Sequence, residues 1–210
     1  MNKEKVSKYI YNSMLTASTT FPEKAWAFHN RSLSINMSRE VYISSFELMY
    51  ESLSTTKLID FQFRLLHNII TTNIQLKQWG LKDDDKCTFC NSQPETTIHL
   101  FLKCNFSGNI WNELYDYIAR HSGTRISLAD TEIMLGVRDK PFASFYNTIT
   151  TITKQYIYAC RCKQTNPTFL VLMEKISFEK HVEKIEAIRI NKINNWQKKW
   201  ELLSHLNFDI

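Results

Sequence analysis

The stretch that decides the fold is KCTFCNSQPETTIHLFLKC, residues Lys86 to Cys104, which holds three of the five cysteines in the 210-residue chain. Within it, Cys87, Cys90, His99 and Cys104 follow the pattern C-x2-C-x8-H-x4-C. A C-x2-C turn lets two thiolates converge on one ion, and a short loop returns the two further ligands that tetrahedral zinc requires. The spacing therefore predicts a zinc site. The alternative is that these cysteines are buried as small apolar side chains.

Four protein ligands fill a tetrahedral coordination sphere and leave no position for a water or a substrate. We therefore expect a structural zinc, which contributes on the order of 10 kcal/mol or more to the folding of such a loop. A zinc hydrolase is the enzymatic alternative, and it requires an open position on the metal. The odd number of cysteines, five, argues against a disulfide framework.

Helical patterns flank the cysteine stretch on both sides. Upstream, apolar residues repeat at helical spacing over residues 57–69. A short second helix is expected from Thr72 or Asn73 to Trp79, with Gly80 as the left-handed residue that ends it. With only four Gly and four Pro in the chain, most residues must lie in long elements. The predicted fold is mainly α, a helical bundle with one small CCHC zinc-binding knuckle.

Three further helices are predicted downstream of the cysteines. The first carries Trp111 and ends near Gly123, and the second spans residues 142–163. The third covers residues 168–205, with a break near Ser177. Its expected buried stripe consists of Val182, Ile185, Ile193, Trp196, Trp200 and Leu203.

The net charge of +5 lies entirely in the last third of the chain. Residues 138–210 contain 12 Lys and Arg against 7 Asp and Glu, whereas residues 1–137 contain 14 of each kind. This distribution favours a polyanionic partner for the C-terminal part. The alternative is a basic helix face that is simply solvated.

Two short segments supply candidate contacts to a nucleic-acid backbone. Arg161 and Lys163 lie in ACRCK, and Lys198 and Lys199 lie between two tryptophans in WQKKW. The alternative for the second segment is that its tryptophans belong to the core and its lysines form a solvated face.

The zinc knuckle itself has an unfavourable charge for phosphate. Zinc with three thiolates and one imidazole is a formal monoanion, and the acidic run at residues 83–85 precedes it. A contact of the knuckle with nucleic acid would therefore use stacking by Phe89 or Phe101. The alternative is that both rings pack against the flanking helices.

The region from Lys57 to Leu114 resembles the zinc-binding region downstream of the polymerase in reverse transcriptases of LINE-type, non-long-terminal-repeat retrotransposons. The residues that carry the resemblance keep the family's order. They are Leu65 to His67, Thr72 and Asn73, Cys87 and Cys90, Glu95 and Thr96, His99 to Phe101, Cys104 and Trp111. A weaker similarity continues from Tyr156 to Phe169.

The resemblance implies a C-terminal, zinc-binding part of a retrotransposon reverse transcriptase that engages RNA or DNA during target-primed reverse transcription. Its partners would be nucleic acid and the upstream reverse transcriptase domain. The chain has no YxDD-like aspartate pair, no set of endonuclease carboxylates and no phosphate-binding GxxxxGK[ST] loop, so we expect no catalytic activity. The alternative function is a zinc-stabilised helical module that binds another protein.

Three segments are predicted: an N-terminal helical or linker segment (1–56), the zinc-binding domain (57–122) and a basic helical region (123–210). No run of eighteen apolar residues and no signal peptide is found, so we expect an intracellular protein, cytoplasmic or nuclear, without a membrane partner. Cys160 and Cys162 lie two residues apart on a predicted helix, a poor geometry for a second metal or redox site.

Overall fold

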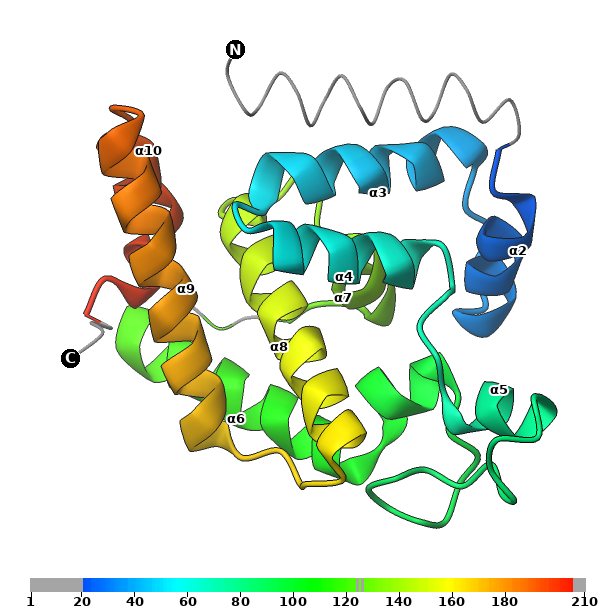
Figure 1. Cartoon of the computed structure of the whole chain (residues 1–210). Helices are drawn as coiled ribbons and strands as arrows, with labels where there is room; N and C mark the ends of the chain where they lie inside the picture. The colour runs from blue at the N-terminus through cyan, green and yellow to red at the C-terminus, as the bar shows by residue number, and fades with distance from the viewer. Residues whose placement is uncertain (1–20, 124, 126, 206–210) are drawn as a thin grey trace.

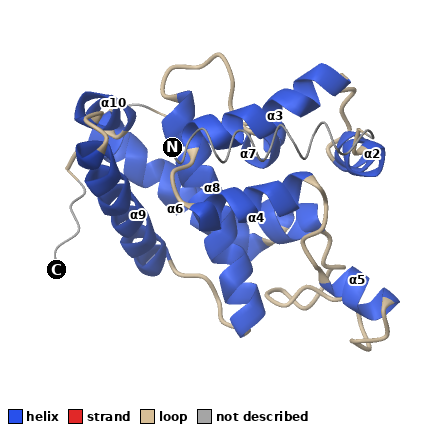
Figure 2. Cartoon of the chain, turned by 45° about the horizontal axis from the view of Figure 1, so that its top comes forward, coloured by secondary structure: helices blue, strands red, loops and turns tan. Residues whose placement is uncertain are grey.

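The computed structural model of the protein describes residues 21–123, 125 and 127–205. These residues form helices joined by short connections and contain no β-strand (Figure 2). They include one isolated β-bridge, between Lys86 and Pro94. The α-helices are α2 (Glu23–Ser32), α3 (Arg39–Ser52), α4 (Thr56–Leu66), α5 (Asn73–Gln78), α6 (Asn105–Ser122), α7 (Asp130–Leu135), α8 (Ala143–Lys163), α9 (Phe169–Arg189) and α10 (Ile193–Lys199). The mainly α prediction is confirmed.

Helix α8 is the central element of the structure. It packs against α3, α4, α7 and α9, and also against the π-helical turn η1 (His99–Lys103) that lies in the cysteine stretch. Figure 1 shows α8 between α4 and α9, with α6 crossing the lower part of the molecule. The predicted inward residues Phe145, Ile149, Ile152 and Tyr156 are all buried. The core therefore surrounds α8 and reaches the zinc knuckle through η1.

The helices around the cysteine stretch agree with the sequence prediction. α4 and α5 lie where helices are predicted over 57–69 and 73–79, and their ends differ from the predicted ends by at most three residues. Gly80 follows α5 with a φ of +68° and Gly123 caps α6 with a φ of +67°. Glycine adopts this left-handed region without the steric cost that a Cβ atom adds, which is why the two helices end there.

The prediction for the last helix is wrong in two respects. α9 continues through Ser177 without a break, and the chain instead turns at residues 190–192, where Asn191 has a φ of +57°. The buried face of α9 is also different, because Ile185 is 56% exposed whereas Glu183 and Ala187 are buried. α9 carries apolar residues on two faces, so periodicity alone selected the wrong one. Of the predicted stripe, Trp200 and Leu203 are buried.

Side chains from all three predicted segments enter one hydrophobic core. Phe46 of α3, Leu65 of α4, Leu114 of α6 and Leu172 of α9 belong to the same cluster of buried residues. A 3-10 turn, η2 (Glu201–Leu203), closes the C-terminal side of this cluster against α6. Among the described residues, no helix is long and apolar enough to cross a membrane.

Candidate metal centre

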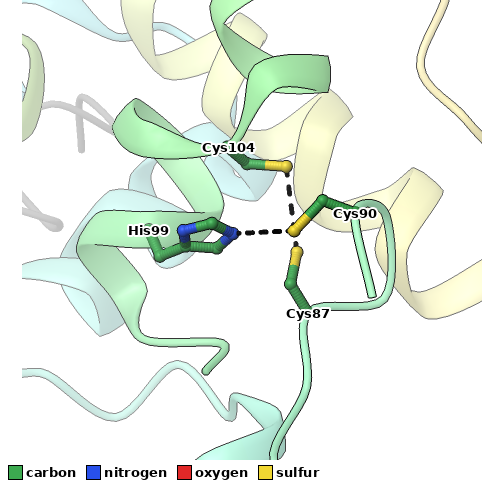
Figure 3. A group of neighbouring side chains, drawn as sticks. All are labelled: Cys87, Cys90, His99 and Cys104. Atoms are coloured by element: carbon green, nitrogen blue, oxygen red, sulfur yellow. Dashed lines mark hydrogen bonds between the residues drawn. The ribbon is translucent and has the colours of Figure 1, made fainter. Parts of the chain in front are cut away.

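The four predicted ligands lie together. The ligand atoms of Cys87, Cys90, His99 and Cys104 are all within 4.8 Å of one another, and Figure 3 shows their side chains converging from the loop and from η1. The Sγ atoms of Cys87 and Cys104 are 3.8 Å apart, and Cys90 Sγ is 3.3 Å from His99 Nε2. Tetrahedral zinc with Zn–S bonds of about 2.3 Å places two sulfurs about 3.8 Å apart. The donor set and the spacing therefore fit a zinc ion.

A compact turn positions the first two ligands. The Cys87 N–H donates to the Gln93 carbonyl at 2.8 Å, and the Asn91 N–H donates to the Cys87 carbonyl at 2.9 Å. Asn91 has a φ of +51°, a conformation that Asn accepts more easily than most residues. The two bonds close the turn, so the thiols of Cys87 and Cys90 point to the same side.

The other two ligands flank the π-helical turn η1. His99 begins the turn, and the Cys104 N–H donates to the His99 carbonyl at 2.8 Å. Cys104 is also the N-cap of the 18-residue helix α6. The positive end of a helix dipole stabilises negative charge within its first turn, so this position favours the Cys104 thiolate. π-helical turns are rare and occur frequently at functional sites.

The thiols need a cation to be ionised together. Burial raises the pKa of Cys87 to about 12 and also raises the pKa of Cys104. At Cys90 desolvation raises the pKa, but the hydrogen bonds from Ser92, Gln93 and His99 together outweigh it and lower the pKa to about 6. A coordinated metal ion deprotonates a thiol outright, so it supplies the charge that offsets the burial of Cys87 and Cys104. The group is a structural zinc site of the Cys3His type.

Phe89 and Phe101, the predicted stacking residues, lie inside the protein. Phe89 is 8% exposed and Phe101 is fully buried. Phe101 contacts Phe61 of α4 edge to face, and its carbonyl accepts a hydrogen bond from Trp111 Nε1 of α6 at 2.7 Å. These rings join the knuckle to the helices, so the prediction that they stack on bases does not hold in this structure.

Two of the four predicted phosphate-binding cations are also internal. Arg161 pairs with the buried Glu95 carboxylate, its Nε lying 2.9 Å from Oε1. Lys199 pairs with Glu183, its Nζ lying 2.7 Å from Oε1, and it also donates to the Ser52 carbonyl at 2.7 Å. Both side chains are committed to internal partners and are not available to phosphate groups. An Arg or Lys within a helical pattern does not reveal that a carboxylate from a distant segment lies beside it.

The other two predicted cations, Lys163 and Lys198, are exposed at the ends of α8 and α10.

The two remaining cysteines do not form a second site. Cys160 is buried and Cys162 is exposed, as expected for positions two apart on a helix. Among the described residues, neither belongs to a group of potential metal ligands.

Part of the positive charge of the C-terminal third lies inside the fold. Lys154 and Lys180 are buried, and each donates to backbone carbonyl groups rather than facing solvent. With Arg161 and Lys199, they account for four of the twelve basic residues after position 137. The charge asymmetry of the sequence therefore overstates the positive charge that this part of the surface presents.

Sequence reasoning missed the buried polar residues behind the zinc loop. Glu95 is fully buried and Asn73 is 2% exposed, and both hydrogen-bond to the loop that carries Cys87. In the sequence, Glu95 has a place only in the resemblance, and Asn73 has in addition only a possible place at the start of the short helix. A polar residue that is required inside a fold has no signature in a single sequence.

The comparisons with known proteins agree with this geometry. The family described as zinc-binding in reverse transcriptase matches residues 6–111, half of the chain, including all four ligands. The match begins further upstream than the resemblance at residues 57–114, and its first part lies outside the described residues. No curated protein matches the chain. The matched region is an accessory zinc-binding region and not a polymerase domain. The chain therefore belongs to the family of zinc-binding regions of reverse transcriptases.

Proposed function

We propose that this chain is the non-catalytic zinc-binding part of a LINE-type reverse transcriptase and that it engages RNA or DNA during target-primed reverse transcription. The observation that carries the proposal is a closed Cys3His site in a chain of this family. Because protein side chains occupy all four positions, the metal has no coordination site for chemistry and serves the fold. The LINE-type assignment rests on the ordered residues of the resemblance, from Leu65 to Trp111.

Three exposed side chains are candidates for nucleic-acid contacts. Lys163 and Lys198 remain as candidates for phosphate contacts. Trp79, at the end of α5 close to the zinc loop, is 60% exposed and offers an aromatic face of the kind that stacks on single-stranded bases. Stacking tolerates any base, so we expect binding with little sequence preference.

Salt dependence of RNA binding tests this proposal. For the wild-type chain, log affinity should fall linearly with log salt concentration. The double substitution Lys163→Ala and Lys198→Ala should reduce that slope by about two, since each lost phosphate contact reduces it by about one. Lys24→Ala, an exposed lysine on α2, is the matched control and should leave the slope unchanged. Absence of RNA and single-stranded DNA binding at low salt would overturn the proposal.

A specific observation favours a second candidate, a module that binds protein. On α9, Val171, Ile185 and Ile188 are 38%, 56% and 61% exposed, on the side away from the core. Such an apolar helix face on a folded protein is typical of an interaction site. The partner that family membership suggests is the polymerase domain of the reverse transcriptase.

Co-purification with a reverse transcriptase polymerase domain separates the two candidates. Ile185→Asp should abolish a complex formed through α9, whereas Lys184→Asp, an exposed neighbour on the same helix, should preserve it. If both variants retain the complex, or if no complex forms, the apolar face of α9 is not the site of that interaction.

A further inference from the structure

A buried carboxylate connects the zinc loop to two helices. Glu95 is fully buried, and its Oε2 accepts the N–H of Thr88, inside the C-x2-C turn, at 2.8 Å. Its Oε1 accepts the N–H of Asn73, the first residue of α5, at 3.0 Å and the Nε of Arg161, near the end of α8, at 2.9 Å. One side chain thus joins the zinc loop to the start of α5 and to α8, 66 residues further along the chain.

The Asn73 side chain completes the connection. Its Nδ2 donates to the Lys86 carbonyl at 2.6 Å and to Thr88 Oγ1 at 3.2 Å. Its Oδ1 accepts from Arg161 Nη2 at 2.7 Å, so Arg161 contacts both Glu95 and Asn73. Burial alone would lower the pKa of Arg161. The Glu95 carboxylate outweighs this effect, so the pKa of Arg161 is raised.

The network holds the peptide groups on both sides of a zinc ligand. The carbonyl of Lys86 precedes Cys87 and is bound by Asn73, and the N–H of Thr88 follows Cys87 and is bound by Glu95. We propose that Asn73, Glu95 and Arg161 are positioning residues for the zinc site, and that Arg161 couples zinc affinity to the packing of α8. Arg161 lies 50 residues beyond the end of the family match at residue 111.

Coupling of this kind is reciprocal. If α8 in its packed position favours zinc binding through Arg161, then bound zinc must favour the packed position of α8 by the same factor. Groups that orient metal ligands from behind typically change metal affinity by 10- to 100-fold when they are substituted. The inference depends on zinc at the Cys3His site and does not depend on nucleic-acid binding.

The chain offers a matched control for this proposal. Glu183 is also a buried carboxylate with three donors, namely Lys199 Nζ at 2.7 Å, Ser54 Oγ at 2.9 Å and Trp200 Nε1 at 2.7 Å. None of its partners belongs to the zinc loop. Glu183→Gln therefore removes a similar buried charge without disturbing the ligands.

The experiment measures zinc affinity by competition with a chromophoric chelator, using the full chain. Glu95→Gln should weaken zinc binding by 10- to 100-fold. The amide N–H groups of Gln would face backbone and guanidinium N–H groups that donate hydrogen bonds to the Glu95 carboxylate. Arg161→Lys, which keeps the charge but cannot reach both Glu95 and Asn73, should weaken it by about 10-fold. Glu183→Gln should leave zinc affinity within about 2-fold even where it lowers the melting temperature as much as Glu95→Gln.

A second measurement follows the coupling in the other direction. Removal of zinc from the wild-type chain should reduce hydrogen-exchange protection at residues 157–163 of α8 more than at residues 176–183 of α9. Equal zinc affinities for Glu95→Gln and Glu183→Gln, or equal loss of protection in the two helices, would overturn the proposal. If the wild-type chain bound no zinc, the Cys3His assignment itself would fail, which is a distinct result.

Discussion

The two buried carboxylates among the described residues, Glu95 and Glu183, have contrasting surroundings. Glu95 lies behind the zinc loop, where Cys87, Phe89 and Glu95 itself are the buried side chains of residues 86–95. Glu183 lies among apolar residues of the core, with Ile176, Ala187 and Leu203 buried around its helix. Each carboxylate holds one basic side chain, Arg161 and Lys199 respectively, at less than 3 Å.

The difference shows which part of the fold depends on metal. A loop with so few apolar residues has little hydrophobic stabilisation, so its order must come from zinc and from polar contacts. The C-terminal helices bury apolar area and need no ion to hold Glu183 and Lys199 together. We therefore expect the two regions to respond differently to loss of zinc and similarly to loss of a charge.

Loss of zinc should have the largest effect and should separate the two regions. Cys87→Ser, or a strong chelator, should unfold residues 86–95 locally, because zinc binding supplies on the order of 10 kcal/mol to such sites. Protection of α9 should persist, since it buries Leu172, Met173 and Ile176 in the hydrophobic core. Zinc content per chain and hydrogen exchange measure the outcome. Cys162→Ser, at an exposed cysteine outside the metal group, is the control. Unchanged zinc content in Cys87→Ser would contradict the assignment of Cys87 as a zinc ligand.

Loss of one charge from each pair should have the next largest effect, and a similar one in both regions. Arg161→Met and Lys199→Met each leave a buried carboxylate without its cation, which costs about 3–5 kcal/mol. Urea unfolding in the presence of zinc gives the change in unfolding free energy. The double substitution Arg161→Met and Glu95→Gln should cost less than the sum of the single ones. A loss below about 1 kcal/mol for either Met variant would show that its pair is not buried in solution.

These two pairs also show what a sequence can reveal. The zinc ligands were predictable because four side chains of the right chemistry lie within eighteen residues, at a spacing that constrains geometry. The helices α4, α5, α6 and α8 were predictable because of their apolar periodicity or a recognisable end, such as Gly80 or Gly123, whereas α7 was not predicted. Local patterns of this kind can be recognised in the sequence without knowledge of the tertiary fold.

The partners of Arg161 and Lys199 could not be predicted. Arg161 meets Glu95 across 66 residues of sequence, and Lys199 reaches the Ser52 carbonyl across 147. A cation in a helix looks the same in sequence whether it faces solvent or a distant carboxylate. The prediction of the buried face of α9 was wrong for a related reason. The exposed and buried faces of α9 are both apolar, and only the packing against α8 and α6 distinguishes them.

Alkaline pH should stabilise the fold in part through Lys180 of α9. Burial lowers the pKa of Lys180 from its ordinary value of 10.5 to about 8, and its Nζ donates to the Leu203 carbonyl at 2.6 Å. Between these two pH values the unfolded chain binds more protons, so stability rises with pH across this window and the gain is lost as pH falls to about 8. The full gain is up to about 3 kcal/mol.

The difference between the pH profiles of wild type and Lys180→Met isolates this contribution. The subtraction is needed because burial also lowers the pKa of Lys154, to about 7, which acts in the same direction. Urea midpoints at pH 8 and above should rise more steeply for wild type than for the variant. Parallel profiles would mean that Lys180 is charged to the same extent in the folded and unfolded chains.

The smallest effect comes from two adjacent lysines at the end of α10. Lys198 is exposed, so Lys198→Ala should change the unfolding free energy by no more than about 0.5 kcal/mol. Lys199→Ala should cost several times more, because it strands the Glu183 carboxylate. In RNA binding the order should reverse, with Lys198→Ala reducing the salt slope by about one and Lys199→Ala leaving it unchanged when compared at equal folded fraction. If Lys199→Ala reduced the salt slope as much as Lys198→Ala, the Lys199 side chain would have to leave Glu183 when RNA binds. Lys199 would then be a surface cation in the complex and not an internal one.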